Sequence, residues 1–215
     1  MEEENYEEEG LGVGEEIEII PGFEISTEEY LKKLEEDPIL LLKILLASHK
    51  NLPKELQEKF AEEDVLVRAK LSVNPSLNKE VMEKLAKDED VRIRKVIALR
   101  KDITPKVVEI LKNDKDEGVR SNLSSNPSVK INDLKDLIRD ESEEVKVSLA
   151  LREDVKNVFD DLLRTSQEKK ENNVIYTLAT NPTIGDENIK KLLQLSDFGV
   201  FIWLCTNESL NKEAM

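Results

Sequence analysis

The sequence predicts an all-α protein, an α-solenoid of about six and a half two-helix repeats that follows an acidic N-terminal extension. Two observations support this fold class. A motif of about 26 residues recurs from Leu42 to the end of the sequence. The 215 residues are 37% charged and 39% hydrophobic, a balance that suits helices with wide solvated faces better than a β-sandwich.

The composition excludes several classes of site and location. A single Cys rules out an internal disulfide framework or a multi-Cys metal site, and a single His makes a His-rich metal site implausible. No segment approaches the roughly 18 consecutive apolar residues of a membrane span. The beginning, MEEENYEEEG, is the opposite of a basic signal-peptide start. We therefore expect a cytoplasmic protein without a small-molecule cofactor.

The composition also divides the chain into an acidic extension, residues 1–40, and a repeat domain, residues 41–215. The extension carries 15 of the 47 acidic residues and only two lysines, whereas the rest of the chain is nearly balanced in charge. Residues 1–14 are expected to be disordered, because their glutamates repel one another.

The remainder of the extension predicts two short elements. Residues 17–25 predict one brief extended segment. Ser26 predicts the N-cap of a helix, with Glu29 reaching back in a capping box, and Asp37-Pro38 ends that helix after about Glu36.

The repeat reads apolar–basic–x–x–Leu–small–x–Asn/Arg, and its fifth position recurs at intervals of 25, 26, 26, 26, 29 and 26 residues. Positions one and five lie one helical turn apart, which predicts that both face the core. Position six is always small, so the neighbouring repeat can approach closely. The longer interval places three extra residues in the stretch 165–173. The residues at positions one, five and six are Leu42, Val67, Ile93, Val119, Val145, Val174, Val200; Leu46, Leu71, Ile97, Leu123, Leu149, Leu178, Leu204; and Ala47, Ser72, Ala98, Ser124, Ala150, Ala179, Cys205.

Each repeat continues through a turn into a second helix. Alternate turns contain Asn-Pro, at 74–75, 126–127 and 181–182, where Pro cannot continue the first helix. The second helix has its own apolar positions and ends in an acidic loop. No β-sheet is needed after residue 42.

Residues 67–88, which read Val-Arg-x-x-Leu-Ser-x-Asn-Pro-Ser-Leu and end in Leu-Ala-x-Asp, resemble the leucine-rich repeat variant family, a relative of HEAT repeats. Residues 119–140 and 174–193 match nearly as well, whereas the repeats that begin at Ile93 and Val145 lack the Asn-Pro. The resemblance implies a right-handed superhelix that serves as a binding scaffold, without chemistry. The family's founding protein also carries a cysteine-ligated iron–sulfur cluster, but this chain lacks those cysteines.

His49 and Cys205 are the residues that most readily suggest catalysis. His49 occupies the eighth motif position, where a polar residue is expected to cap or bridge the end of the first helix. Cys205 occupies the small-residue position and is expected to be a packing residue. The two lie six repeats apart, so a Cys–His pair within one chain is excluded.

The second motif position forms a basic column of Lys43, Arg68, Arg94, Arg120 and Lys146. One interpretation is a stripe for an acidic ligand such as nucleic-acid phosphates. The other, which we favour, is a structural ladder in which each basic residue pairs with a carboxylate of the preceding acidic loop. No aromatic residues alternate with the basic ones, which also disfavours general nucleic-acid binding.

Arg100 and Arg152 replace the Asn of the eighth position, and we expect them to be exposed and functional. The apolar run 198–205 is either an interface or a point where the chain continues. Within it, Phe201 and Trp203 stand at positions that hold basic residues in the second repeat.

We expect a non-enzymatic scaffold that binds another protein along the face of the first helices. The alternatives are a nucleic-acid-binding protein and an acidic decoy whose N-terminal segment occupies a partner's basic groove. Self-association through the apolar C-terminal repeat is a further possibility. The expected partner-binding residues are Lys70, Arg100, Asn122, Arg152, Tyr176, Phe201 and Trp203.

Overall fold

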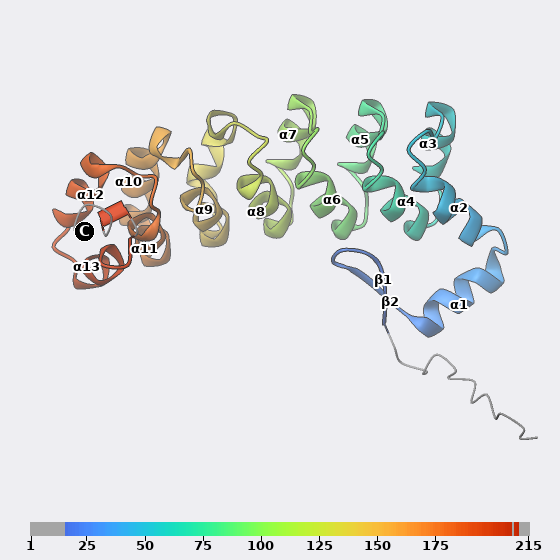
Figure 1. Ribbon diagram of the computed structural model, residues 1–215, viewed down its shortest axis with the longest axis horizontal. Helices are drawn as coiled ribbons and strands as arrows, with labels where there is room; N and C mark the ends of the chain where they lie inside the picture. Colours follow the sequence, from blue (N-terminus) through green and yellow to red (C-terminus); the bar gives the residue numbers. More distant parts are fainter. Residues whose placement is uncertain (1–15, 208, 211–215) are drawn as a thin grey trace, which may run out of the picture. The chain divides into compact units, whose positions relative to one another are not determined.

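The computed structural model describes residues 16–207, 209 and 210, and the protein is largely helical (Figure 1). The predicted disorder of residues 1–14 and any role of their glutamates lie outside the described residues. The chain divides into two compact units, one up to Leu85 and one from Ala86 onward, which are considered separately. Among the described residues, none of the helices combines the length and apolar character needed to span a bilayer.

The first unit begins with a β-hairpin and continues with short helices. The single extended segment expected at residues 17–25 is wrong, because two antiparallel strands form on either side of Pro21-Gly22. Gly22 has a φ of 75°, which permits the tight reversal. The elements are β1 (Glu16–Ile20), β2 (Phe23–Ser26), α1 (Thr27–Glu36), α2 (Leu40–Ala47), α3 (Lys54–Phe60), α4 (Val65–Ser72) and α5 (Lys79–Leu85).

The predicted cap of α1 is confirmed, since the Ser26 hydroxyl accepts a hydrogen bond from the Glu29 backbone N–H at 3.2 Å. The hairpin packs against α4 through β1 and buries Ile19, Ile20 and Phe23. An apolar hairpin therefore covers part of a helix in this unit.

The second unit contains helices only, among the residues described from Ala86 onward. They are α6 (Val91–Ala98), α7 (Pro105–Leu111), α8 (Glu117–Ser125), the 3-10 helices η1 (Ile131–Arg139) and η2 (Val155–Asn157), α9 (Glu143–Ala150), α10 (Phe159–Lys169), α11 (Asn172–Thr180), α12 (Asp186–Leu193) and α13 (Phe198–Leu204).

Alternate helices pack on one another in both units, and these are the first helices of the sequence repeat. In the first unit α2 packs on α4, and in the second unit α6, α8, α9, α11 and α13 form a row (Figure 1). The predicted burial of the small residues at position six is confirmed at 0% exposure for Ala47, Ser72, Ala98, Ser124, Ala150 and Ala179. Small side chains thus permit the close approach of successive first helices.

The core positions are buried in every repeat except the first. Positions one and five have exposures of 0–2% from Val67 to Leu204. Leu42 and Leu46, which were expected in the core, are 55% and 39% exposed. In the first unit α2 packs on α4, and in the described part of the chain no first helix precedes α2 to cover its other side.

Two second helices depart from the regular pattern. Ile131, Leu134 and Leu137 are buried at intervals of three residues, a spacing that suits the 3-10 helix found there. The long sequence interval is accommodated by α10, which extends to Lys169 and ends at Lys170 in a left-handed conformation.

Candidate partner-binding face

The basic column forms ion pairs that connect successive loops. Arg94 binds the Asp114 carboxylate through two hydrogen bonds of 2.7 and 2.9 Å, and it donates to the Asp88 carbonyl at 2.8 Å. Arg120 repeats this arrangement one repeat later, with Asp140 at 2.7 and 2.8 Å and the Asp114 carbonyl at 2.8 Å. For Arg94 and Arg120 the expected pairing is thus corrected in one respect: the preceding loop supplies carbonyls and the following loop supplies the carboxylate.

The two ends of the column are lysines: Lys146 repeats this arrangement, whereas Lys43 pairs with carboxylates both before and after it, so the expected pairing with the preceding loop is confirmed there. Lys146, which is fully buried, contacts the Glu171 carboxylate and the Asp140 carbonyl. In the first unit Lys43 binds Asp37 at 2.9 Å and Glu63 at 2.7 Å. Arg68 donates to the Glu63 carbonyl at 2.7 Å. Because Arg94, Arg120 and Lys146 are buried against carboxylates, they offer no cationic surface to a phosphate.

These pairs change the acidity of the carboxylates. Burial raises the pKa of Asp114, but the hydrogen bonds and charge of Arg94 together with the Asp116 backbone N–H outweigh burial and hold the pKa below its usual value. For Asp140, Arg120 and the Ser142 backbone N–H together outweigh burial in the same way and lower the pKa. Both carboxylates are therefore ionised at neutral pH and belong to the internal framework.

The eighth motif position forms a second internal column. Its asparagines donate to two backbone carbonyls of the preceding repeat, at the end of the first helix, where carbonyls lack helical partners. Asn126 donates to Ala98 at 2.7 Å and Arg100 at 2.9 Å, and Asn181 donates to Ala150 at 2.7 Å and Arg152 at 2.9 Å. Asn74 and Asn207 make the equivalent pairs.

The expected exposure of Arg152 and Arg100 is wrong. Arg152 is 8% exposed and donates to the carbonyls of Ser124, Asn126 and Val129 at 2.7–3.0 Å. It takes the place of Asn with a longer reach. The Arg100 side chain is 9% exposed and pairs with Asp102 at 2.8 Å.

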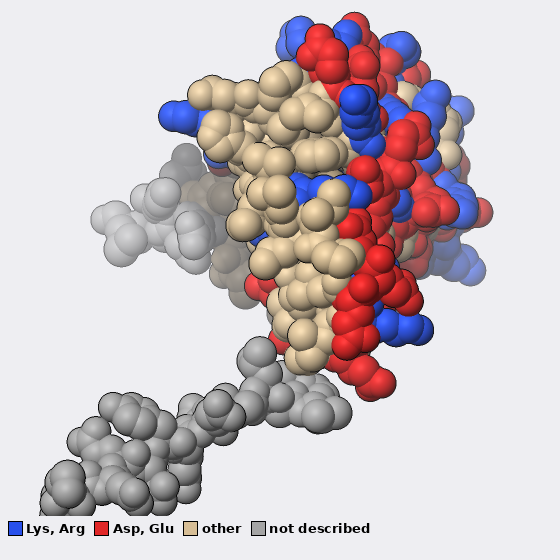
Figure 2. Space-filling model, turned by 90° about the vertical axis from the view of Figure 1, so that its right-hand side faces the viewer, with Lys and Arg blue, Asp and Glu red and all other residues tan. Residues whose placement is uncertain are grey.

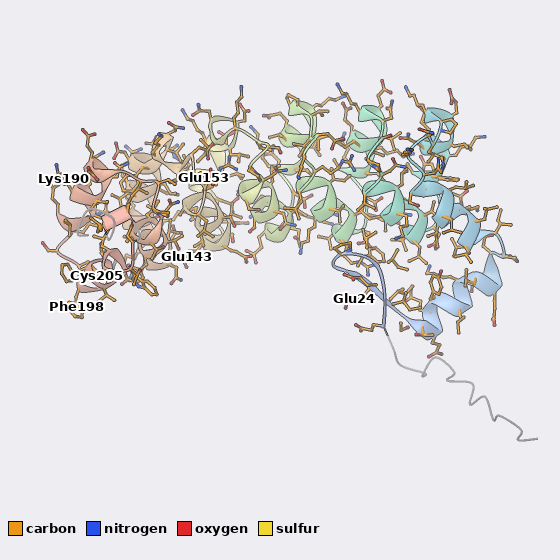
Figure 3. All side chains as sticks on the ribbon, viewed as in Figure 1. Glu24, Glu143, Glu153, Lys190, Phe198 and Cys205 are labelled. Carbon is orange, nitrogen blue, oxygen red and sulfur yellow. The ribbon has the colours of Figure 1, made fainter. Side chains whose placement is uncertain are left out.

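The side chains left for a partner lie on one face of the row α6–α13. They occupy the motif positions three, four and seven and the residue just before position one, which share one helical face. We call this the first-helix face. Figure 3 shows Glu143 of α9 and Phe198 of α13 toward one side of this row and Lys190 of α12 toward the other. The residues of the first-helix face with the largest side chains are Arg92, Lys95, Leu99, Asn122, Glu144, Leu151, Tyr176, Ile202 and Trp203.

The expected partner-binding residues differ in their surroundings. Asn122 is partly exposed and donates to the Lys95 carbonyl at 3.3 Å. Lys70, in the first unit, is also partly exposed. Phe201 and Trp203 are 56% and 45% exposed, and Trp203 stacks on Tyr176 with ring centroids 6.4 Å apart.

Sequence reasoning missed the role of two glycines within these helices. A Cβ on Gly199 would lie 2.5 Å from the Tyr176 hydroxyl, and a Cβ on Gly118 would lie 2.6 Å from Lys95 Cε. Each glycine makes room for a large side chain of the preceding first helix. The signal was present, because both glycines interrupt otherwise regular helices and stand 23 residues after the large residue.

Two surface hollows of about 360 Å³ each lie beside the first helices of the second unit. One is lined by Ile175, Tyr176 and Val200, near the N-terminal ends of α11 and α13. The other is lined by Ser125, Leu151 and Glu153, at the C-terminal ends of α8 and α9. Both adjoin side chains of the first-helix face.

His49 and Cys205 both lie at the surface. The Nδ1 atom of His49 accepts a hydrogen bond from the Asn51 N–H at 3.3 Å. Cys205 is a free, exposed thiol, so its expected role in packing is wrong; the row ends at α13, and no first helix follows it in the described part of the chain. Within residues 16–207, 209 and 210, no three His, Cys, Asp or Glu side chains are grouped to hold a metal.

Comparison with known proteins adds no assignment. The chain matches no protein-family model, and no similar protein emerged among either the curated proteins or the solved structures.

Proposed function

We propose that the protein is an α-solenoid of the leucine-rich repeat variant type and that it acts as a non-enzymatic scaffold for another protein. The support for the fold is the agreement between the sequence period and the internal hydrogen bonds. Asn126 and Asn181 make the same two bonds to the repeat before them, and Arg94 and Arg120 make the same pairs to the loop after them.

One observation carries the function: the residues that repeat are internal, and the residues that vary lie on the first-helix face. Position four is Val96, Asn122, Ser148, Thr177 and Trp203 along α6–α13, and none of these is fully buried. Ser148 and Trp203 also contact the preceding first helix, but unlike side chains make that contact, so stacking alone does not fix the residue at this position. A chemically varied, extended surface is suited to recognising another protein through many modest contacts.

The first-helix face changes in chemical character from α6 to α13, and this change indicates what the partner must present. Arg92 and Lys95 make the α6 end charged and polar, with side chains 40% exposed that pair with Asp90 at 2.7 Å and Asp116 at 3.4 Å. Tyr176, Ile202 and Trp203 make the other end apolar and aromatic, beside the hollow near Val200. The proposed partner therefore presents polar and charged groups toward α6 and a large apolar side chain toward α11 and α13, where buried aromatic anchors contribute most.

The test is capture of a partner from a lysate of the source by the wild-type protein and two matched variants. Tyr176→Ala combined with Trp203→Ala removes the aromatic end, and Leu193→Ala removes an equally exposed apolar side chain from the second helix α12. We expect a nuclease-resistant, stoichiometric protein that the double variant loses at least tenfold and the control retains. Nuclease-sensitive nucleic acid, or capture that neither variant changes, would overturn the proposal.

A further inference from the structure

Helix α2 in the first unit exposes an apolar face that the first-helix face does not include. Leu41, Leu42 and Leu45 are 47%, 55% and 62% exposed, and Leu46 is 39% exposed. Ile39, just before the helix, is 57% exposed. Figure 2 shows a broad, largely uncharged area at this end of the unit, with a few basic side chains within it and a band of acidic side chains along one side. So many large apolar side chains on an eight-residue helix indicate a docking surface.

The repeat register identifies what kind of element fits this face. Leu45 stands at motif position four. In the second unit this position contacts the preceding first helix: the Ser148 Oγ of α9 lies 2.8 Å from the Ser121 Oγ of α8, and Trp203 of α13 stacks on Tyr176 of α11. Leu41 stands at the position of Gly118 and Gly199, which also receive the preceding helix. The exposed side of α2 therefore corresponds to the side through which α8, α9 and α13 contact the first helix before them.

His49 supplies a polar contact for the same purpose. It occupies the column in which Asn126 and Asn181 each donate to two carbonyls at the end of the preceding first helix. His49 Nδ1 already accepts from Asn51, so in the neutral ring the proton is on Nε2, which can donate outward. A helix stacked on α2 would present its terminal carbonyls to this group.

Charge decides among the possible occupants. Residues 1–85 hold 22 acidic and 10 basic side chains, a formal charge of −12 out of −15. A second copy docked through the same face, or an anionic lipid surface, would bring like charges together. A helix with lysines or arginines beside its apolar stripe would instead meet the band of acidic side chains.

We propose that the exposed face of α2 is a docking site for a cationic amphipathic helix of another protein, which stacks on it as an additional first helix. The site lies in the first unit and does not depend on the function proposed for the row α6–α13. Leu41, Leu42 and Leu45 supply the apolar contacts of this site, and His49 supplies the polar contact. The band of acidic side chains beside it favours a positively charged helix over a negatively charged one.

The experiment measures binding of two fluorescent 18-residue peptides with the same leucine stripe, one with lysine flanks and one with glutamate flanks. We expect the lysine peptide to bind, and the variant Leu42→Ser/Leu45→Ser to weaken it at least tenfold. Leu193→Ser, which changes a 50% exposed leucine of the second helix α12, is the matched control and is expected to bind as wild type. His49→Ala is expected to weaken binding several-fold, whereas His49→Asn, which introduces the residue of four other repeats, retains it.

Several outcomes would overturn the proposal. Equal binding of the lysine peptide to the double variant would show attraction by charge alone, and equal binding of the glutamate peptide would remove the charge selection. A dimer in sedimentation that the double variant abolishes would assign the face to a second copy. Recruitment of the wild type, but not the double variant, to vesicles with one-third anionic lipid would assign it to a membrane.

Discussion

Single arginines in this protein each connect three segments. Arg94 joins its own helix to a carbonyl of the loop before it and to the carboxylate of Asp114 in the loop after it, and its fork of donors suits this geometry. Asp114 in turn accepts from the Asp116 backbone N–H at 2.9 Å, which shapes the turn into α8. The pair thus holds two acidic loops at a fixed separation.

Asp114→Asn is therefore expected to destabilise the protein strongly. The Arg94 and Asp114 side chains are only 6% and 7% exposed, so the variant leaves a buried guanidinium without its counter-charge, at a cost of about 3–5 kcal/mol in unfolding free energy. Urea denaturation at pH 7 measures the change. Asp136→Asn is the control, because this carboxylate pairs with Lys112 but is 77% exposed, and we expect a far smaller change in unfolding free energy. Equal costs for both variants would contradict this account of the pair.

The lowered pKa of Asp140 predicts the direction of acid sensitivity. A carboxylate whose pKa is lower in the folded than in the unfolded state stabilises the fold fully above the unfolded value of about 3.9 and loses that contribution as the pH falls through the folded pKa. The stability difference between wild type and Asp140→Asn should thus be largest at pH 7 and shrink below about pH 4. Urea titrations at several pH values measure it. A difference that grows on acidification would have the wrong sign.

The described α-helices are too short to be stable alone, since each has seven to eleven residues. Packing on neighbouring helices therefore supplies their stability. Where one helix carries a large side chain toward the next, the next carries glycine: Tyr176 meets Gly199 and Lys95 meets Gly118. The two pairs differ in what can move. The Lys95 ammonium end is flexible, whereas the Tyr176 ring is held by its stack on Trp203.

This difference predicts opposite effects for the same substitution in two helices. Gly118→Ala should raise stability by up to about 1 kcal/mol, because alanine favours the helix and Lys95 can swing aside. Gly199→Ala should lower it by about 1–3 kcal/mol, because the new Cβ displaces the Tyr176 ring from Trp203. Thermal and urea unfolding give the signs, and Trp203 fluorescence should change only for Gly199→Ala. Two variants with the same sign would contradict this explanation.

At the scale of the whole chain, the sequence predicted the features that depend on the spacing of residues along the chain. The small residues at position six from Ala47 to Ala179 and the core residues at positions one and five from Val67 to Leu204 are buried as their spacing predicts. The cap at Ser26 is also found where the sequence places it. The hairpin was missed because β1 and β2 are only five and four residues long and flank a single turn. The burial of Arg152 was missed because a charged side chain in an asparagine column reads as exposed, although its long stem and five donors let it reach three carbonyls. The exposure of Leu42 depends on what lies before α2, which no local pattern contains.

A row of helices in which each member contacts only its neighbours should respond to damage locally. Leu123, which is fully buried in α8, provides the test: Leu123→Ala should cost about 2–5 kcal/mol in unfolding free energy. Because α8 packs on α6 and α9, amide hydrogen exchange should speed up most in these three helices and least in α13, which contacts α11 and α12. Leu151→Ala, which truncates a 65% exposed side chain, should leave both measurements nearly unchanged. A uniform loss of protection from α6 to α13 would instead indicate one cooperative core and would contradict the proposed solenoid.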